Sequence, residues 1–483
     1  MTLTITNVSE PNIGVAAPQA IPLVHPDELR TMFALAMSQM YKGEVPLYGD
    51  LVRIVQDVNE EFLKQYSDQL PSSTGWERLA LERHGAIRLG KVSELRTVRR
   101  IFALLGMHPV GYYDLSVAGL PMHATCFRPI DRDSLDRNPF RIFTTLLRPE
   151  LIRSNEARDS ALNLLSRRMI FSDELMRMIS NAEKQGSRLS PDQAETFIQE
   201  ALRTFSWAPV AASTYTEYQH LKSEHPILAD IACFRTAHIN HLTPRTLNIE
   251  SAQRVMSEEG MAVKDRIEGP PFRECPILLR QTSFLALEEK IQFSNGDNED
   301  DNRVIGSHRA RFGEIEQRGA AVTPAGRLLY DQLLGEATTA ASGLGPEAFD
   351  RALEKAFRKY PDNWSQLRRQ GLVYCEYRCT KKSLPTTVIG HPTNDPTVVE
   401  RLIDEGILET VPITYEDFLP FSAAGIFQSN LSGKSQPEII KPTPDIGSME
   451  EALECPIIDP DALYAAHQKR SLDSSLSKLA SSL

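Results

Sequence analysis

Two histidines in the run from Ala237 to Arg245, AHINHLTPR, carry side chains that can bind a metal. Pro244 disfavours helical geometry at the residue before it, so residues 238–243 are predicted to form a strand. Side chains three apart on a strand point to opposite faces, so His238 and His241 cannot both reach one metal. One of them could be a ligand whose partners come from elsewhere in the chain. The alternative is a buried histidine that is hydrogen-bonded within the core.

A second candidate ligand lies in residues 82–90, which are also predicted to form a strand. His84, Ala86 and Arg88 alternate along this segment and would share one face, so a ligand and a cation would point into the same cavity. The alternatives are that His84 lies in a surface turn and that Arg88 pairs with a carboxylate on a helix.

Residues 308–319 are predicted to form a third strand with two carboxylates on one face, Glu314 and Glu316. Adjacent carboxylates on a strand are unfavourable unless one of them is paired or bound to a metal. Glu316 is expected to pair with a nearby arginine, such as Arg318 or Arg311. Glu314 is the candidate metal ligand on this strand.

His84, His241 and Glu314 together match a ligand set that holds Fe(II) and leaves positions open for substrate and oxygen. The chain also contains His123 and His308 in predicted strands. These two could support the site, although roles in the core or at the surface are favoured for both.

The composition narrows the classes of function. The chain has 483 residues, 41% of them hydrophobic, and a formal net charge of −11, which argues against a broad nucleic-acid-binding surface. No apolar run approaches membrane-spanning length. Residues 1–25 lack Lys and Arg and match neither a secretory signal nor a transit peptide. The six cysteines form no CxxC pair, which favours reduced thiols in a cytoplasmic compartment.

Hydrophobic periodicity and capping signals predict alternating groups of strands and helices, and so an α+β fold. Residues 294–302 are predicted to form an exposed acidic loop rather than a calcium site. Helices are predicted at 28–42 with Asp27 as its cap, 50–66, 93–105, most of 155–225, 323–335, 346–358 and in two short segments after Ser448. Further strands are predicted at 110–114, 122–127, 228–243, 276–284 and 372–379.

Four motifs occur in order: His84–Arg88 (HGAIR), His238–Arg245 (HINHLTPR), Arg311–Gly319 (RFGEIEQRG) and Leu419–Phe427 (LPFSAAGIF). With these motifs the chain resembles the 2-oxoadipate dioxygenase/decarboxylase family, also called hydroxyglutarate synthase. The resemblance extends from about Asp27 to Asn430.

The resemblance implies a core similar to the vicinal-oxygen-chelate fold, elaborated by helical insertions and terminal helices. The expected organisation is a flexible extension (1–25), a catalytic domain (26–430) with a helical insertion at about 155–225, a linker (431–447), and C-terminal helices with a tail (448–483).

The resemblance also implies roles for individual residues. His84, His241 and Glu314 would bind Fe(II) and contact the substrate. Arg88 would be the catalytic residue that binds a substrate carboxylate. The chain around Phe421 and Ser422 would close over the substrate. Phe421 departs from the family, which more often has a smaller aliphatic residue there, so a narrower pocket could alter the preferred length of the substrate.

The implied reaction converts 2-oxoadipate and O2 into 2-hydroxyglutarate and CO2, a step of lysine breakdown. The implied partners are therefore a small 2-oxo diacid and O2, with no nucleic acid or membrane. Two alternatives remain: a dioxygenase or isomerase of the same fold that acts on a different 2-oxo acid, or a non-catalytic binding protein that kept the fold.

Overall fold

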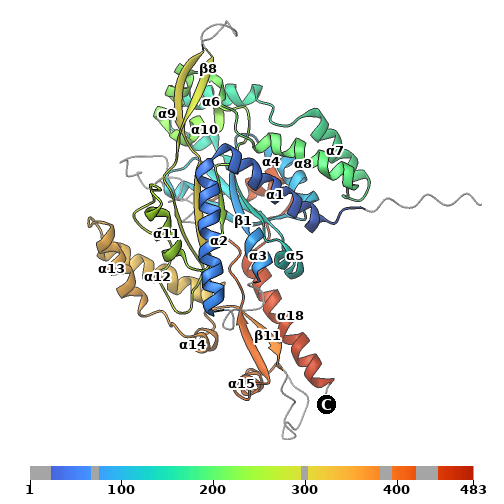
Figure 1. The fold of residues 1–483 in the computed structure, drawn as a ribbon, viewed down its shortest axis with the longest axis vertical. Coiled ribbons are helices and arrows are strands. Elements are labelled where there is room, and N and C mark those ends of the chain that lie inside the picture. Colours follow the sequence, from blue (N-terminus) through green and yellow to red (C-terminus); the bar gives the residue numbers. More distant parts are fainter. Residues whose placement is uncertain (1–22, 67–74, 295–302, 381–393, 420–443, 482–483) are drawn as a thin grey trace, which may run out of the picture.

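The computed structural model describes residues 23–66, 75–294, 303–380, 394–419 and 444–481. At its centre is a mixed seven-stranded sheet with the order β2-β3-β4-β1-β6-β10-β7 (Figure 1). Its strands are β1 (Arg83–Leu89), β2 (His108–Asp114), β3 (Met122–Arg128), β4 (Arg141–Leu147), β6 (His241–Pro244), β7 (Leu279–Ser283) and β10 (Phe312–Arg318). β6 pairs antiparallel with β1 and parallel with β10. The three strands that carry the candidate ligands are therefore neighbours.

Two smaller sheets and a series of helices surround the large sheet, so the predicted α+β class is confirmed. The small sheets contain β5 (Val210–Thr214), β8 (Glu288–Ser294) and β9 (Val304–Arg309), and β11 (Cys375–Cys379) and β12 (Leu408–Pro412). The first helices are α1 (Pro26–Glu44), α2 (Pro46–Tyr66), α3 (Trp76–Leu81), α4 (Val92–Leu104), α5 (Arg132–Arg137), α6 (Asn155–Arg167), α7 (Asp173–Lys184), α8 (Pro191–Phe205) and α9 (Tyr215–Glu224). The later ones are α10 (Pro226–Ala232), α11 (Ile249–Glu258), α12 (Pro324–Ala340), α13 (Pro346–Phe357), α14 (Trp364–Arg369), α15 (Pro396–Asp404), α17 (Ile446–Leu453) and α18 (Pro460–Ala480).

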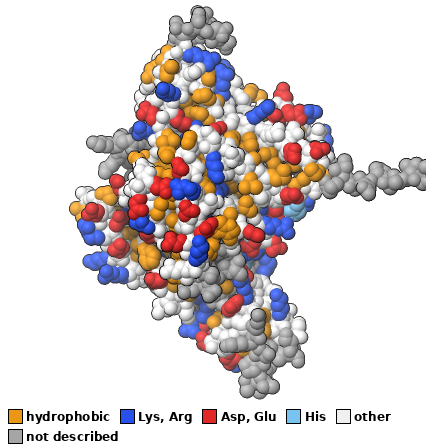
Figure 2. Space-filling view, viewed as in Figure 1, with side chains coloured by type: hydrophobic (Ala, Val, Ile, Leu, Met, Phe, Trp, Pro, Cys, Tyr) orange, Lys and Arg blue, Asp and Glu red, His pale blue; other side chains and the backbone are white. Residues whose placement is uncertain are grey.

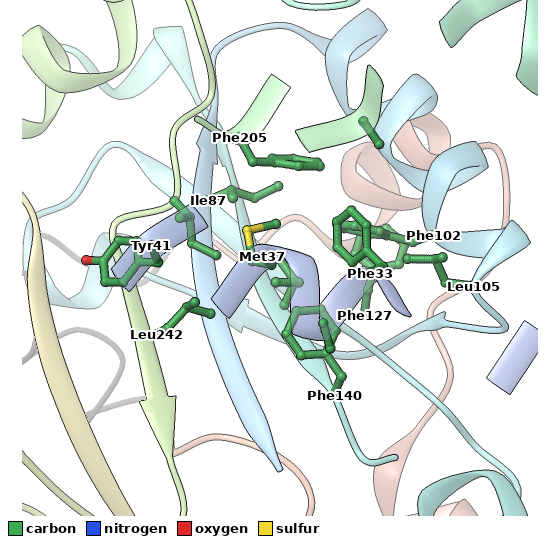
Figure 3. Packing of buried hydrophobic residues seen from close by; sticks show 14 of the residues in the cluster. Phe33, Met37, Tyr41, Ile87, Phe102, Leu105, Phe127, Phe140, Phe205 and Leu242 are labelled. Atoms are coloured by element: carbon green, nitrogen blue, oxygen red, sulfur yellow. The ribbon is translucent and has the colours of Figure 1, made fainter. Parts of the chain in front are cut away.

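Helix α1 packs its apolar face into the main core. Figure 3 shows Phe33 and Met37 among Phe102, Phe127 and Phe140, all of them buried. Burying each such side chain contributes about 1.5–3 kcal/mol. This packing fixes α1 beside the sheet that carries the candidate site.

Near its end, α1 also makes polar contacts with the backbone at the site. The Tyr41 hydroxyl lies 2.9 Å from the carbonyl oxygen of Asn240 and 2.8 Å from that of Phe312. These two residues directly precede His241 and Gly313 in the chain. One buried phenol therefore joins the backbones that enter β6 and β10.

Two glycines in the sequence motifs allow close packing next to candidate ligands. A Cβ atom at Gly85 would lie 2.5 Å from Ile239 Cδ1, and one at Gly313 would lie 2.4 Å from Phe284 Cε1. Real Cβ atoms do not approach other atoms so closely, so a side chain at Gly85 would displace the side chain of Ile239, and one at Gly313 would displace that of Phe284.

The strand predicted at 228–243 is wrong for most of its length. Residues 226–232 form α10, which begins at Pro226. His225 caps this helix, because its side chain accepts a hydrogen bond from the Ile227 amide. A short apolar run fits a buried helix as well as a buried strand, and here the proline and cap favour the helix. The strand itself begins only at His241, because the amides of Ala237 and Ile239 bond to the end of α8.

Other boundaries also differ from the sequence predictions. His25, rather than Asp27, caps α1; Asp445, rather than Ser448, caps α17; and α18 is long rather than short. The predicted strand 308–319 is divided between β9 and β10, and strand β4 was not predicted. Residues 295–302, and with them almost all of the predicted acidic loop, lie outside the described residues.

Side chains of both signs are interspersed on the face in Figure 2. None of the helices in the described ranges is long and apolar enough to cross a bilayer. The six cysteines are free.

Candidate metal centre

The structure brings His84, His241 and Glu314 together in the interior. One ligand atom from each of them lies within 4.8 Å of the others, and all three side chains are buried. The His84 and His241 rings meet edge to face, with centroids 5.4 Å apart. Strand register explains the meeting, because His241 lies opposite Ala86, whose small side chain leaves room beside His84.

Glu314 is held by neutral donors on the strands beside it. The Thr243 hydroxyl and the Gln281 amide donate to Glu314 Oε2, each at 3.0 Å, and His84 Nε2 lies 3.1 Å from the same oxygen. Glu314 Oε1 is buried and has no hydrogen-bond partner among the described residues. A buried carboxylate oxygen without a partner is costly, so this atom is suited to binding a cation.

The two histidines differ in their electrostatic surroundings. Burial, together with the charges of His84 and Arg88, holds the pKa of the His241 imidazole well below its usual value. Burial also acts to lower the pKa of His84, but the charge of Glu316 and hydrogen bonds to Glu314 and Glu316 outweigh it, so that pKa is raised. His241 is therefore neutral and able to donate a lone pair to a metal.

These residues fit a divalent transition metal. Two imidazoles and one carboxylate converge on one buried point, and the carboxylate offers an oxygen that no described donor occupies. This donor set suits Fe(II) and related metals and leaves other positions of the metal free. The group is thus a possible metal-binding site.

The pairing expected for Glu316 is confirmed for one of the two arginines. Arg318 contacts both oxygens of Glu316, at 2.9 and 2.8 Å, and Arg141 lies 3.5 Å from one of them. Arg311 instead contacts Glu44 and Glu289. Glu316 is thus neutralised without a metal, whereas Glu314 has no arginine partner among the described residues.

Arg88 lies on the same face of β1 as His84 and is buried, and it pairs with Asp230 on α10. The sequence left open that Arg88 pairs with a carboxylate on a helix, and the contact with Asp230 is such a pair. Asp230 Oδ1 also lies 2.8 Å from His308 Nε2 and 3.2 Å from His238 Nε2. His238 and His308 thus support the partner of Arg88 and are not part of the His84–His241–Glu314 group.

Sequence reasoning missed Asp230, Thr243 and Gln281. Asp230 lies in the run that was predicted to be a strand, and its partner is 142 residues away in the chain, so no local pattern indicated the pair. Alternation could have indicated Thr243, which shares a strand face with His241. Gln281 carries no motif signal.

The remaining candidates lie apart from this group or outside the described residues. His123 on β3 contacts Tyr112 instead. Phe421 and Ser422 lie outside the described residues, which stop at Leu419 before resuming at residue 444. The nearby Phe418 is described, and its ring meets His84 edge to face at 4.9 Å.

Comparison with known proteins gives a consistent result over nearly the whole chain. The family model of 2-oxoadipate dioxygenase/decarboxylase matches residues 33–430. Proteins of that name from Escherichia coli (strain K12) and Pseudomonas putida are 47% and 46% identical, covering 92% and 93% of this chain and 97% and 96% of their own lengths. The crystal structure of the hydroxyglutarate synthase from Pseudomonas putida in complex with 2-oxoadipate superposes with a TM-score of 0.84 at 43% identity, over 95% of this chain and 99% of that one. The chain belongs to the 2-oxoadipate dioxygenase/decarboxylase family.

Proposed function

We propose that this protein is an Fe(II) enzyme that converts 2-oxoadipate and O2 into 2-hydroxyglutarate and CO2, as a step of lysine breakdown. The observation that carries the proposal is the buried group of His84, His241 and Glu314, in a chain that superposes closely on a relative with 2-oxoadipate bound. Bound iron would supply the redox chemistry and the place where the 2-oxo acid and O2 meet.

The side chains of this protein would orient and anchor the substrate. His84, His241 and Glu314 would hold the metal, with Glu314 kept in place by Thr243 and Gln281. Arg88 would bind the far carboxylate of the diacid, because it faces the same side of β1 as His84, four residues along. Four residues of a strand span about 13 Å, which accommodates two side chains with a short diacid between them.

The chain around Phe421 and Ser422 would complete the pocket, as the family resemblance implies.

The oxygen atoms of the proposed reaction balance without a second organic substrate. One atom of O2 enters the carboxylate formed when CO2 leaves, and the other becomes the hydroxyl group on the neighbouring carbon.

A panel of 2-oxo acids tests the proposal. The protein is purified anaerobically, loaded with Fe(II), and assayed for O2 uptake and CO2 release with 2-oxo acids of different lengths, with and without a terminal carboxylate. We expect the highest kcat/KM for 2-oxoadipate, with one CO2 released for each O2 consumed. A higher value for another 2-oxo acid would favour the alternative substrate. No bound iron and no O2 uptake would favour a binding protein.

A further inference from the structure

The His84 ring lies between two buried carboxylates. Its Nε2 atom is 3.1 Å from Glu314 Oε2, and its Nδ1 atom is 2.9 Å from Glu316 Oε2. Both glutamates have no exposed surface. The alternation of β10 places them on one face, and the imidazole reaches over the intervening strand β6 to meet both. Each ring nitrogen therefore has a different carboxylate.

Glu316 is an acceptor that is already neutralised by arginine. Arg318 contacts both of its oxygens, and Arg141 approaches one of them. A carboxylate paired with arginine acts as a hydrogen-bond acceptor, so Glu316 Oε2, 2.9 Å away, is placed to accept from the nitrogen of His84 that faces it.

His241 has no equivalent support among the described residues. Its Nδ1 atom has no carboxylate oxygen within 4.0 Å in the described part of the chain, its Nε2 atom lies 3.9 Å from Glu314 Oε2, and its ring stacks on Phe312 at 4.8 Å. Packing therefore orients His241, whereas the ring of His84 is also held between two carboxylates. The two candidate ligands should respond differently when their surroundings are changed.

We propose that Glu316 is a positioning residue of the metal centre, which accepts the Nδ1–H of His84 and thereby directs the lone pair of Nε2 towards the metal. This inference rests on the proposed metal-dependent function. Carboxylates that accept from a metal-bound histidine fix its tautomer and orientation and strengthen metal binding. Glu316 does this without contacting the metal, because the arginines occupy its oxygens.

The variant E316Q tests the inference. Glutamine has similar size but one acceptor oxygen, which Arg318 and His84 would have to share, and it lacks the negative charge. We expect Zn(II) and Co(II) to bind the metal-free variant about 10- to 100-fold more weakly than they bind the wild-type protein, measured by competition with a chromophoric chelator. Because this readout is metal affinity, it does not depend on turnover.

E82Q is the matched control. Glu82 has no exposed surface and contacts Arg141 at 2.8 Å and Arg245 at 3.0 Å, so its loss disturbs the same arginine cluster. If only cluster stability matters, E82Q and E316Q should weaken metal binding equally, and that result would overturn the inference. We expect E82Q to lower the melting temperature and to keep the wild-type metal affinity.

A measurement on the wild-type protein tests the orientation of His84 that the inference requires, even if E316Q does not fold. In 15N-histidine NMR spectra of the Zn(II)-loaded protein, His84 should carry its proton on Nδ1 and bind zinc through Nε2. Zinc bound through Nδ1 would overturn the inference. Failure of the wild-type protein to bind any metal would instead overturn the proposed function, so the two failures are distinguishable.

Discussion

The variants H84A, H241A and E314Q are each expected to lose bound iron and O2 uptake while keeping the fold. Each removes one donor from a buried site that has three candidate ligands. The loss of metal affinity should exceed the roughly 100-fold that follows from losing an outer partner of a ligand. Iron content after anaerobic loading, measured with the melting temperature and the circular dichroism spectrum, tests this prediction.

H238A is the control for these variants. His238 belongs to the same sequence motif as His241 and is equally buried, but its Nε2 atom lies 3.2 Å from Asp230 rather than in the metal group. The H238A variant should therefore retain bound iron. Full iron occupancy in H241A, together with loss of iron in H238A, would reverse the assignment of the two histidines.

The second large effect is expected for R88K, which should impair use of 2-oxoadipate but leave the bound iron in place. Lysine keeps the charge but lacks the planar fork that binds a carboxylate through two hydrogen bonds. Loss of a buried charge-assisted pair costs about 2–5 kcal/mol, which corresponds to a fall in kcat/KM of roughly 30-fold or more. Steady-state O2 uptake measures the change.

R30K is a matched control for R88K. Arg30 is also fully buried and pairs with an aspartate, Asp27, at 2.8 Å, but it lies on α1 at the core. The R30K variant should have a lower melting temperature than the wild-type protein and an unchanged kcat/KM. An R88K enzyme with the kcat/KM of the wild-type protein would show that Arg88 does not anchor the substrate.

Alternation along strands was the most useful property of the sequence. It placed His84 and Arg88 on one face of their strand, and Glu314 and Glu316 on one face of theirs. In the structure these two strand faces are buried on the same side of the sheet. The same reasoning separated His238 from His241, although His238 precedes the strand rather than lying within it. Local periodicity therefore predicted which side chains share a face.

Elements without periodicity were predicted poorly. Residues 141–147 and 227–232 are almost uniformly buried, so neither run shows the alternation that separates a strand from a helix. Contacts between distant segments were also inaccessible. The pair of Arg88 and Asp230 joins a strand to a helix 142 residues away, and only the folded chain shows it.

The most direct test of the proposed reaction is the fate of the two atoms of O2. The Fe(II)-loaded protein is incubated with 2-oxoadipate under 18O2, and the product is analysed by mass spectrometry. We predict 2-hydroxyglutarate with one labelled atom in its new carboxylate and one in its C2 hydroxyl group, because a single diacid is both oxidised and hydroxylated while Arg88 holds its far end. Glutarate as the main product, or a strict requirement for a second organic substrate, would contradict the proposal.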